Sequence, residues 1–430
     1  MGKNSTVRSI FEVYKIGAGP SSSHSIGPER AAREFLHSLP RPPARIRVTL
    51  FGSLALTGRG HLTDTSIRRA LDPVAVDFAW DTETRPLPHP NTMKFEAFAA
   101  DGKTMRDWTV YSIGGGSLAD ASGPVGESDR AVYPFGAISD AIRYAEMQGV
   151  AFWQVVEQVE RDVWPRLEAI WQAMRASVER GLRSDERFLP GALKLRRRAR
   201  DSHAAAGGQT SPQRDLALLS AFGLAVSEEN ASGGTIVTAP SCGAAGIVPG
   251  LLYYFEEEKR TPRERILRAL ATAGVFGSVI RANASVSGAE VGCQGEVGSA
   301  CSMAAAAGSQ ILGGTLRQIE YAAEIAMEHH LGLTCDPIEG YVQIPCIERN
   351  MIACLRAFEC ASFSVTTDGR HLVSFDDVIE VMYRTGQDMR SAYRETARGG
   401  LASVWRRRMA EQSAIAPEAA PSGGAQSQCA

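Results

Sequence analysis

The sequence of 430 residues lacks the features that mark several protein classes. No stretch approaches the ~20 consecutive apolar residues of a membrane-spanning helix, and the opening residues MGKNSTVRSIFEVYKIG have no apolar core typical of a signal peptide. Lys and Arg (46) nearly balance Asp and Glu (48), so no strong attraction to nucleic acid or an anionic membrane follows. We therefore expect a cytoplasmic globular protein with no nucleic-acid partner and no membrane partner.

The cysteines lack the close spacing of zinc ribbons and ferredoxins. Without an export signal, eight cysteines in a large chain indicate metal binding or catalysis rather than a disulfide framework. Three of them adjoin glycine or proline, namely Cys293 in VGCQGEVG, Cys335 in TCDPIEG and Cys346 in QIPCIERN. Glycine and proline turn the chain sharply, so thiols at such corners can point into one shared space.

We interpret Cys293, Cys335 and Cys346 as ligands that converge on one iron–sulfur cluster. Spacing alone leaves a second interpretation open, in which they are inert buried thiols. Cys354 and Cys360 lie in an apparently regular helix and are expected to pack in the core. A cluster with three cysteines leaves one iron without a protein thiolate, and an open metal position is what Lewis-acid catalysis requires.

A serine-rich loop, GAGPSSSHSIGP, precedes a helix predicted over residues 28–39. Pro28 suits the first turn of that helix. Free N–H groups at a helix start, together with the hydroxyls of Ser21, Ser22 and Ser23, could hold a carboxylate. A serine-rich cap without a ligand is the alternative, and His24 in the middle of the loop favours the binding site.

A second histidine, His61, lies in a glycine-rich turn after the strand predicted over residues 44–54. A surface position is the usual one for a lone histidine in a turn. Gly58, Gly60 and Asp64 around it favour a shaped loop, in which Asp64 could orient the imidazole.

The order of the predicted elements indicates an α+β protein, with an N-terminal α/β domain followed by an all-α helical catalytic domain. We place the N-terminal domain at 1–135, a helical connection with a polar loop at 136–213, and the helical domain at 214–405. Alanine and glycine are frequent in the last of these, so its helices should pack closely. The segment 406–430, which contains Cys429, is expected to be a flexible tail.

The motifs together resemble one family, the bacterial iron–sulfur L-serine dehydratases (L-serine ammonia-lyases) in their single-chain form. The similarity extends from about residue 10 to 402. The matching stretches are SSSHSIGP, GSLALTGRGHLTD, HPNTMKF, YSIGGG, LPGALKLRRRA, ENASGGTIVTAPSCGAAGIVPG, GAEVGCQGEVGSACSMAAAA, EHHLGLTCDPIEGYVQIPCIERN and ETARGGLA.

This resemblance implies a 4Fe-4S cluster on Cys293, Cys335 and Cys346, and a homodimer that converts L-serine to pyruvate and ammonia without pyridoxal phosphate. Such an activity belongs to amino-acid catabolism and gluconeogenesis. The resemblance also implies that substrate binds between the two domains, with His61 as the base and His24 nearby in the site. The residues implied to bind substrate are Ser21, Ser22, Ser23, Asn230, Gly233 and Gly234.

The sequence also departs from the family pattern. Thr92 and Ala192 stand where glycine is usual. Family members often end in a cysteine shortly after GGLA, which caps the open iron; here the chain continues, and Cys429 is the candidate for a labile cap. Glu296 and Asp336 near the cluster are candidates to bind the substrate ammonium.

Two rival functions remain at this point. One is a pyridoxal-phosphate lyase with Lys194 as its Schiff-base residue, although Lys194 lies in a polycationic run. The other is an amino-acid or redox sensor that uses the same cluster as a switch.

Overall fold

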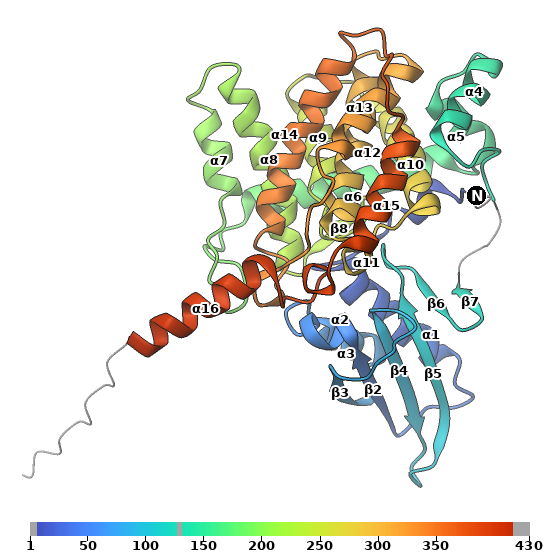
Figure 1. Ribbon diagram of the computed structural model, residues 1–430, viewed down its shortest axis with the longest axis vertical. Helices are drawn as coiled ribbons and strands as arrows, with labels where there is room; N and C mark the ends of the chain where they lie inside the picture. Colours follow the sequence, from blue (N-terminus) through green and yellow to red (C-terminus); the bar gives the residue numbers. More distant parts are fainter. Residues whose placement is uncertain (1–6, 127–130, 416–430) are drawn as a thin grey trace, which may run out of the picture.

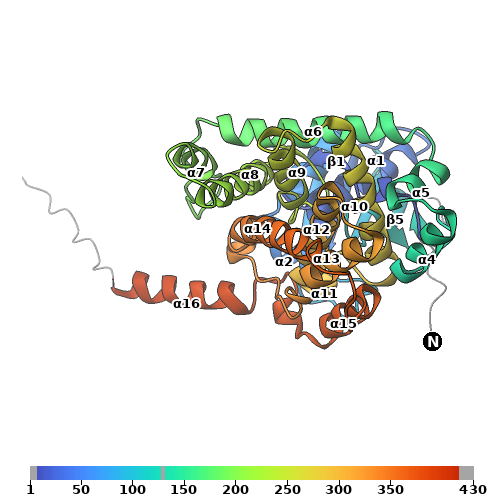
Figure 2. The ribbon, with the colours of Figure 1, turned by 90° about the horizontal axis from the view of Figure 1, so that it is seen from above.

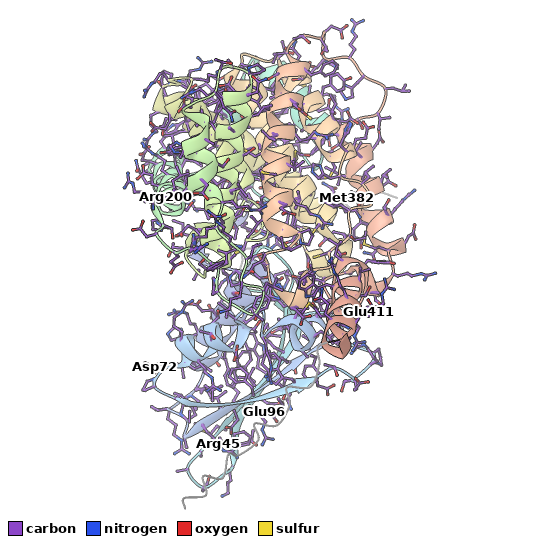
Figure 3. The ribbon with its side chains drawn as sticks, turned by 90° about the vertical axis from the view of Figure 1, so that its left-hand side faces the viewer. Arg45, Asp72, Glu96, Arg200, Met382 and Glu411 are labelled. Atoms are coloured by element: carbon purple, nitrogen blue, oxygen red, sulfur yellow. The ribbon has the colours of Figure 1, made fainter. Side chains whose placement is uncertain are left out.

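The computed structural model describes residues 7–126 and 131–415, and the fold is α+β as predicted. A sheet with its helices lies at one end of the molecule, below a larger group of helices (Figure 1). Within the described residues, no helix is both long enough and apolar enough to cross a membrane. Charged side chains such as Arg45, Asp72 and Glu96 cover the sheet end, and Arg200 lies on the outside of the helical part (Figure 3).

The six-stranded sheet has the strand order β3-β2-β4-β5-β6-β7. β2 and β3 are parallel, whereas the remaining neighbours are antiparallel. Alternate residues of β2, Ile46, Val48 and Leu50, are fully buried, because one face of the sheet packs on helices. The strands are β2 (Arg45–Phe51), β3 (Ala75–Asp81), β4 (Thr92–Phe98), β5 (Thr104–Ser112), β6 (Leu118–Asp120) and β7 (Gly123–Val125).

Three helices belong to this region: α1 (Gly27–His37), α2 (Gly52–Thr57) and α3 (Thr63–Leu71). α1 contributes Ala31 and Phe35 to the core of the sheet region. Pro28 lies in the first turn of α1, as predicted. The loop expected before it is helical instead: Ser22–Ile26 forms a π-helical turn, because the Ser21 hydroxyl accepts a hydrogen bond from the His24 backbone N–H and caps it.

The helical part is built around α12 (Ser299–Ile311), whose residues are buried except for Gln310. Its alanines let α10, α13 and α14 approach closely, and the view from above shows α12 among them (Figure 2). The helices are α4 (Ile138–Gln148), α5 (Phe152–Val159), α6 (Val163–Arg183), α7 (Ala199–Ala206), α8 (Gln213–Ala231), α9 (Ile247–Glu257), α10 (Arg263–Asn283), α11 (Gly288–Val291), α12, α13 (Leu316–Glu328), α14 (Cys346–Ser364), α15 (Phe375–Asp388) and α16 (Gly400–Ile415).

Several short elements lie where the sequence predicted none. β1 (Ile16–Ala18) pairs with β8 (Thr235–Val237), a short strand in a part expected to be wholly helical. The β-branched residues of β8 supply a partner for the incoming chain. The predicted polar connection contains α7, and α16 continues to Ile415 and projects from the body (Figure 1). The proposed cap, Cys429, lies outside the described residues.

Candidate functional site

The three predicted cluster cysteines come from different elements of the helical part. Cys293 follows Gly292, whose φ of +75° bends the chain. Cys335 lies in an extended segment that pairs with Arg394, and Cys346 is the first residue of α14. All three side chains are buried, at 3%, 3% and 9% exposure respectively.

The thiols of Cys293 and Cys335 lie close to each other, and Cys346 interacts electrostatically with Cys293. The ligand atoms of Cys293, Cys335 and Glu296 are all within 4.8 Å of each other. A hydrogen bond with Cys293, together with burial, raises the pKa of Cys335 well above its usual value. Burial, with Cys293 nearby, does the same for the pKa of Cys346. Burial alone would lower the pKa of Arg349, but the three cysteines and Asp336 together raise it above its usual value.

The residues present fit an iron–sulfur cluster. Thiolates are the donors that iron–sulfur clusters use. Gly288 keeps the wall of the site thin, because a Cβ there would lie 3.1 Å from the Cys335 Sγ atom and 2.8 Å from a Glu296 oxygen. Cys301 serves a different purpose, since its thiol donates to the Ala353 carbonyl across a helix–helix contact. Cys354 and Cys360 are likewise buried on α14.

The two predicted histidines stack on each other at the edge of the sheet region, with ring centroids 4.4 Å apart. The Nδ1 atom of His61 lies 2.9 Å from the Thr57 carbonyl, which can only accept. The proton therefore sits on Nδ1, and Nε2 carries a free lone pair. Burial lowers the pKa of His61 to about 4, so the ring is neutral at neutral pH. Thr57, rather than Asp64, orients this imidazole.

His24 is held at both of its ring nitrogens. Its Nε2 atom lies 3.1 Å from the Ser53 hydroxyl, which itself donates to the Glu395 carbonyl at 2.6 Å. Nε2 is therefore the donor, and Nδ1 accepts from the Ser23 hydroxyl at 2.9 Å. Burial, followed by the neighbouring His61, lowers the pKa of His24. Of the two histidines, only His61 has a ring nitrogen left for a reacting proton.

The predicted substrate-binding residues also meet. Ser21 and Ser23 lie with their hydroxyl oxygens 3.4 Å apart, beside buried Ser22. The Asn230 amide donates to the Pro20 carbonyl at 2.8 Å, and Gly19 N–H donates to the Gly234 carbonyl at 3.1 Å. The Oδ1 atom of Asn230 is buried with no hydrogen-bond partner among the described residues. Gly233, with φ of +76°, makes the turn that brings this segment to the serines.

One residue of the site was missed from the sequence. Glu395 opens the motif ETARGGLA, but nothing in the motif itself assigned it a role. Its backbone N–H donates to the Cys335 carbonyl at 2.7 Å, while its Oε1 atom lies 3.4 Å from His24 Nδ1 and 3.6 Å from His61 Nε2. Glu395 thus joins the thiol side of the site to the histidine side.

Two other candidates do not lie free in this site. Asp336 accepts from the Leu401 backbone N–H at 2.6 Å and from the Thr334 hydroxyl at 3.1 Å, so it fixes the turn before α16. Lys194 is exposed, unlike the buried lysine of a Schiff-base site. Glu296 remains beside the thiols, and burial raises its pKa to about 7.

Comparison with known proteins supports the same assignment along nearly the whole chain. The family model of the serine dehydratase beta chain matches residues 9–77, and that of the serine dehydratase alpha chain matches residues 79–402. This chain belongs to the serine dehydratase family. The boundary between the two matched segments falls within β3. Each segment therefore contributes strands to the same sheet.

Individual members of the serine dehydratase family are similar over most of their length. The L-serine dehydratase of Streptomyces coelicolor is 42% identical, with 92% of this chain and 98% of the relative covered. L-serine dehydratase 2 of Escherichia coli is 40% identical over the same shares of the two chains. The L-serine dehydratase of Helicobacter pylori is 36% identical, again with 92% and 98% covered.

Proposed function

We propose that this protein is an iron–sulfur L-serine dehydratase that converts L-serine to pyruvate and ammonia. One observation carries the proposal: a single buried carboxyl, Glu395, lies 3.6 Å from the free Nε2 atom of His61 and interacts electrostatically with all three buried thiols. A base and a metal-binding set at one place suit the elimination of water from an amino acid, because the base takes the Cα proton and a Lewis acid assists the departing hydroxide. The names of the relatives, L-serine dehydratases, support the same substrate.

Cys293, Cys335 and Cys346 would hold a 4Fe-4S cluster. Bound there by three thiolates, the cluster supplies one open iron as a Lewis acid for the departing hydroxide. Arg349, close to all three cysteines, offsets the negative charge of the thiolates in the buried site.

His61 removes the Cα proton of serine. Its Nδ1–H bond to Thr57 fixes the tautomer, and burial keeps Nε2 unprotonated and ready to accept. His24 does not take part in proton transfer: it stacks on His61 and holds the serine turn in place. The Ser21 and Ser22 hydroxyls and the second N–H of the Asn230 amide are suited to the substrate carboxylate, because the Ser23 hydroxyl already donates to His24.

The electron pair of the broken Cα–H bond forms the double bond as hydroxide leaves the β-carbon. The product, 2-aminoacrylate, tautomerises to an imine, and water hydrolyses it to pyruvate and ammonia. The proton taken by His61 and the hydroxide together account for the released water.

The direct test is anaerobic purification followed by measurement of pyruvate formed from L-serine. We expect serine-dependent pyruvate formation in protein that contains iron and acid-labile sulfide. An amino-acid or redox sensor would bind the cluster or serine without turnover, so iron-loaded protein that forms no pyruvate would contradict the proposal.

A further inference from the structure

The carboxyl group of Glu395 is buried without an adequate partner. Its side chain is 5% exposed, and Oε2 has no hydrogen-bond partner among the described residues. Removing a carboxylate from water is costly unless hydrogen bonds or a counter-charge replace the lost solvation. A buried acceptor of this kind in a folded protein calls for a ligand or another explanation.

The side-chain atoms nearest the other oxygen of Glu395 are acceptors, and the donor beside this carboxyl is the neutral backbone N–H of Ala289. His61 Nε2 and His24 Nδ1 lie 3.6 and 3.4 Å from Oε1. The hydrogen bonds to Thr57, Ser53 and Ser23 leave both of these nitrogens without a proton. Three acceptor atoms therefore converge, and the arrangement lacks a hydrogen-bond donor that carries a positive charge.

The backbone holds this carboxyl where it is. Glu395 has φ of +53°, a left-handed conformation that is unfavourable for a residue with a side chain. Its N–H donates to the Cys335 carbonyl, and its carbonyl accepts from Ser53. Contacts from both parts of the molecule thus keep Glu395 facing inward.

We propose that Glu395 binds the ammonium group of the substrate, an inference that rests on the proposed L-serine dehydratase function. A primary ammonium offers three N–H donors and one positive charge, which match the free oxygen and the buried carboxylate. Because Oε1 lies 3.6 Å from His61 Nε2, an ammonium held there places the adjacent Cα–H beside the base. Glu395 then selects amino acids over acids without an amine.

A metal ion fits this place less well. Two imidazoles and one carboxylate do form sites for divalent metals. However, His24 Nδ1 has a single lone pair, and the Ser23 hydroxyl already occupies it at 2.9 Å. Only two of the three groups remain available, so the geometry favours an organic cation over a metal.

The sequence candidates for the ammonium are placed differently. Asp336 already accepts from Leu401 and Thr334. Glu296 lies against Cys293 and Cys335 on the thiol side. Of the three carboxyls, Glu395 alone contacts both histidines.

The test compares two ligands that differ only in the amine, L-alanine and propionate, neither of which can lose water. Calorimetry on the anaerobic holoenzyme measures both affinities in the wild type and in Glu395→Gln. We expect the variant to bind L-alanine about 30-fold more weakly, the size of a hydrogen bond to a charged group, with propionate changed less than about threefold. Glu380→Gln, on the exposed face of α15, should bind both ligands like the wild type.

Equal weakening of both ligands in Glu395→Gln, or no change in either, would overturn the proposal. If that variant does not fold, the wild type still decides, because equal affinity for L-alanine and propionate contradicts an ammonium site. Pyruvate formation by the wild type is measured separately. Turnover without a preference for the amine therefore defeats only the role of Glu395, whereas absence of turnover defeats the proposed function.

Discussion

The histidine side and the thiol side of the site are built in different ways. His24 and His61 come from turns at helix ends of the sheet region, and a chain of hydrogen bonds through Ser23, Ser53 and Thr57 fixes them. Cys293, Cys335 and Cys346 instead come from three different elements of the helical part, which helix packing brings together. Polar contacts thus order the histidine side, whereas packing between helices positions the proposed cluster ligands on the thiol side.

Loss of one thiol should have the largest effect. Cys335→Ala removes one of the three proposed ligands, so we expect loss of the cluster and of all activity. Iron and acid-labile sulfide assays check this. The matched control is Cys360→Ala, a buried thiol on α14, which should retain both. Full iron content in Cys335→Ala would remove this residue from the ligand set.

On the histidine side, a substitution should lower the turnover rate and leave the iron content unchanged. His61→Gln removes the one ring nitrogen that is free in the His24–His61 pair, so turnover should fall about 100- to 10,000-fold, the usual contribution of a general base. The visible absorbance of the cluster should stay unchanged. His37→Gln, at the exposed end of α1, serves as the control. Normal turnover in His61→Gln would assign the proton transfer to another group.

The buried His61 also predicts how the free energy of unfolding depends on pH. The folded pKa of His61 is about 4, below the value of about 6.5 in an unfolded chain, so the unfolded state binds the extra proton first. The free energy of unfolding is therefore unaffected by protonation of His61 above pH ~6.5. It falls by about 3 kcal/mol as the pH drops towards 4, because only the unfolded chain takes up the proton. Urea unfolding at pH 7.5 and 5 measures this difference in the free energy of unfolding. If His61→Gln loses as much stability between the two pH values as the wild type, the assignment to His61 is refuted.

A smaller effect is expected where the two parts join beside the site. His89 Nε2 lies 3.0 Å from the Glu290 carboxylate on α11, just before Cys293, and its Nδ1 accepts from the Asn91 N–H. His89→Ala should lower the free energy of unfolding by about 1–2 kcal/mol, measured by urea titration. Glutamine can still donate to Glu290. If His89→Gln keeps the wild-type free energy of unfolding, the loss in His89→Ala comes from the hydrogen bond and not from packing.

The smallest effect is expected at Lys194. Its side chain is exposed, so Lys194→Ala should change turnover less than about twofold. Loss of activity would reopen the pyridoxal-phosphate alternative.

The sequence predicted the polar parts of the site better than their connections. The three cysteines, both histidines and the serine turn could be named as candidates because each lies beside glycine, proline or a helix start, which local patterns reveal. Glu395 was missed, since its importance comes from a positive φ and from contacts with Cys335, His24 and His61, none of which a spacing shows. The π-helical turn at Ser22–Ile26 was expected as a loop because serine-rich segments next to glycine and proline are typical of turns.

The domain boundaries remain predictions, but the structure shows why composition alone is a poor guide to them. Residues near the start of the chain, such as Ile10 and Tyr14, belong to the core of the helical part. β1 then pairs with β8, more than two hundred positions later in the chain. Tertiary pairing of this kind overrides local propensity.

The most direct measurement is the iron and acid-labile sulfide content of the anaerobically purified protein. Three convergent thiols around one cluster predict about four iron and about four sulfide per chain, and their parallel loss in Cys335→Ala. Wild-type protein that converts serine to pyruvate but contains neither iron nor sulfide would contradict the account.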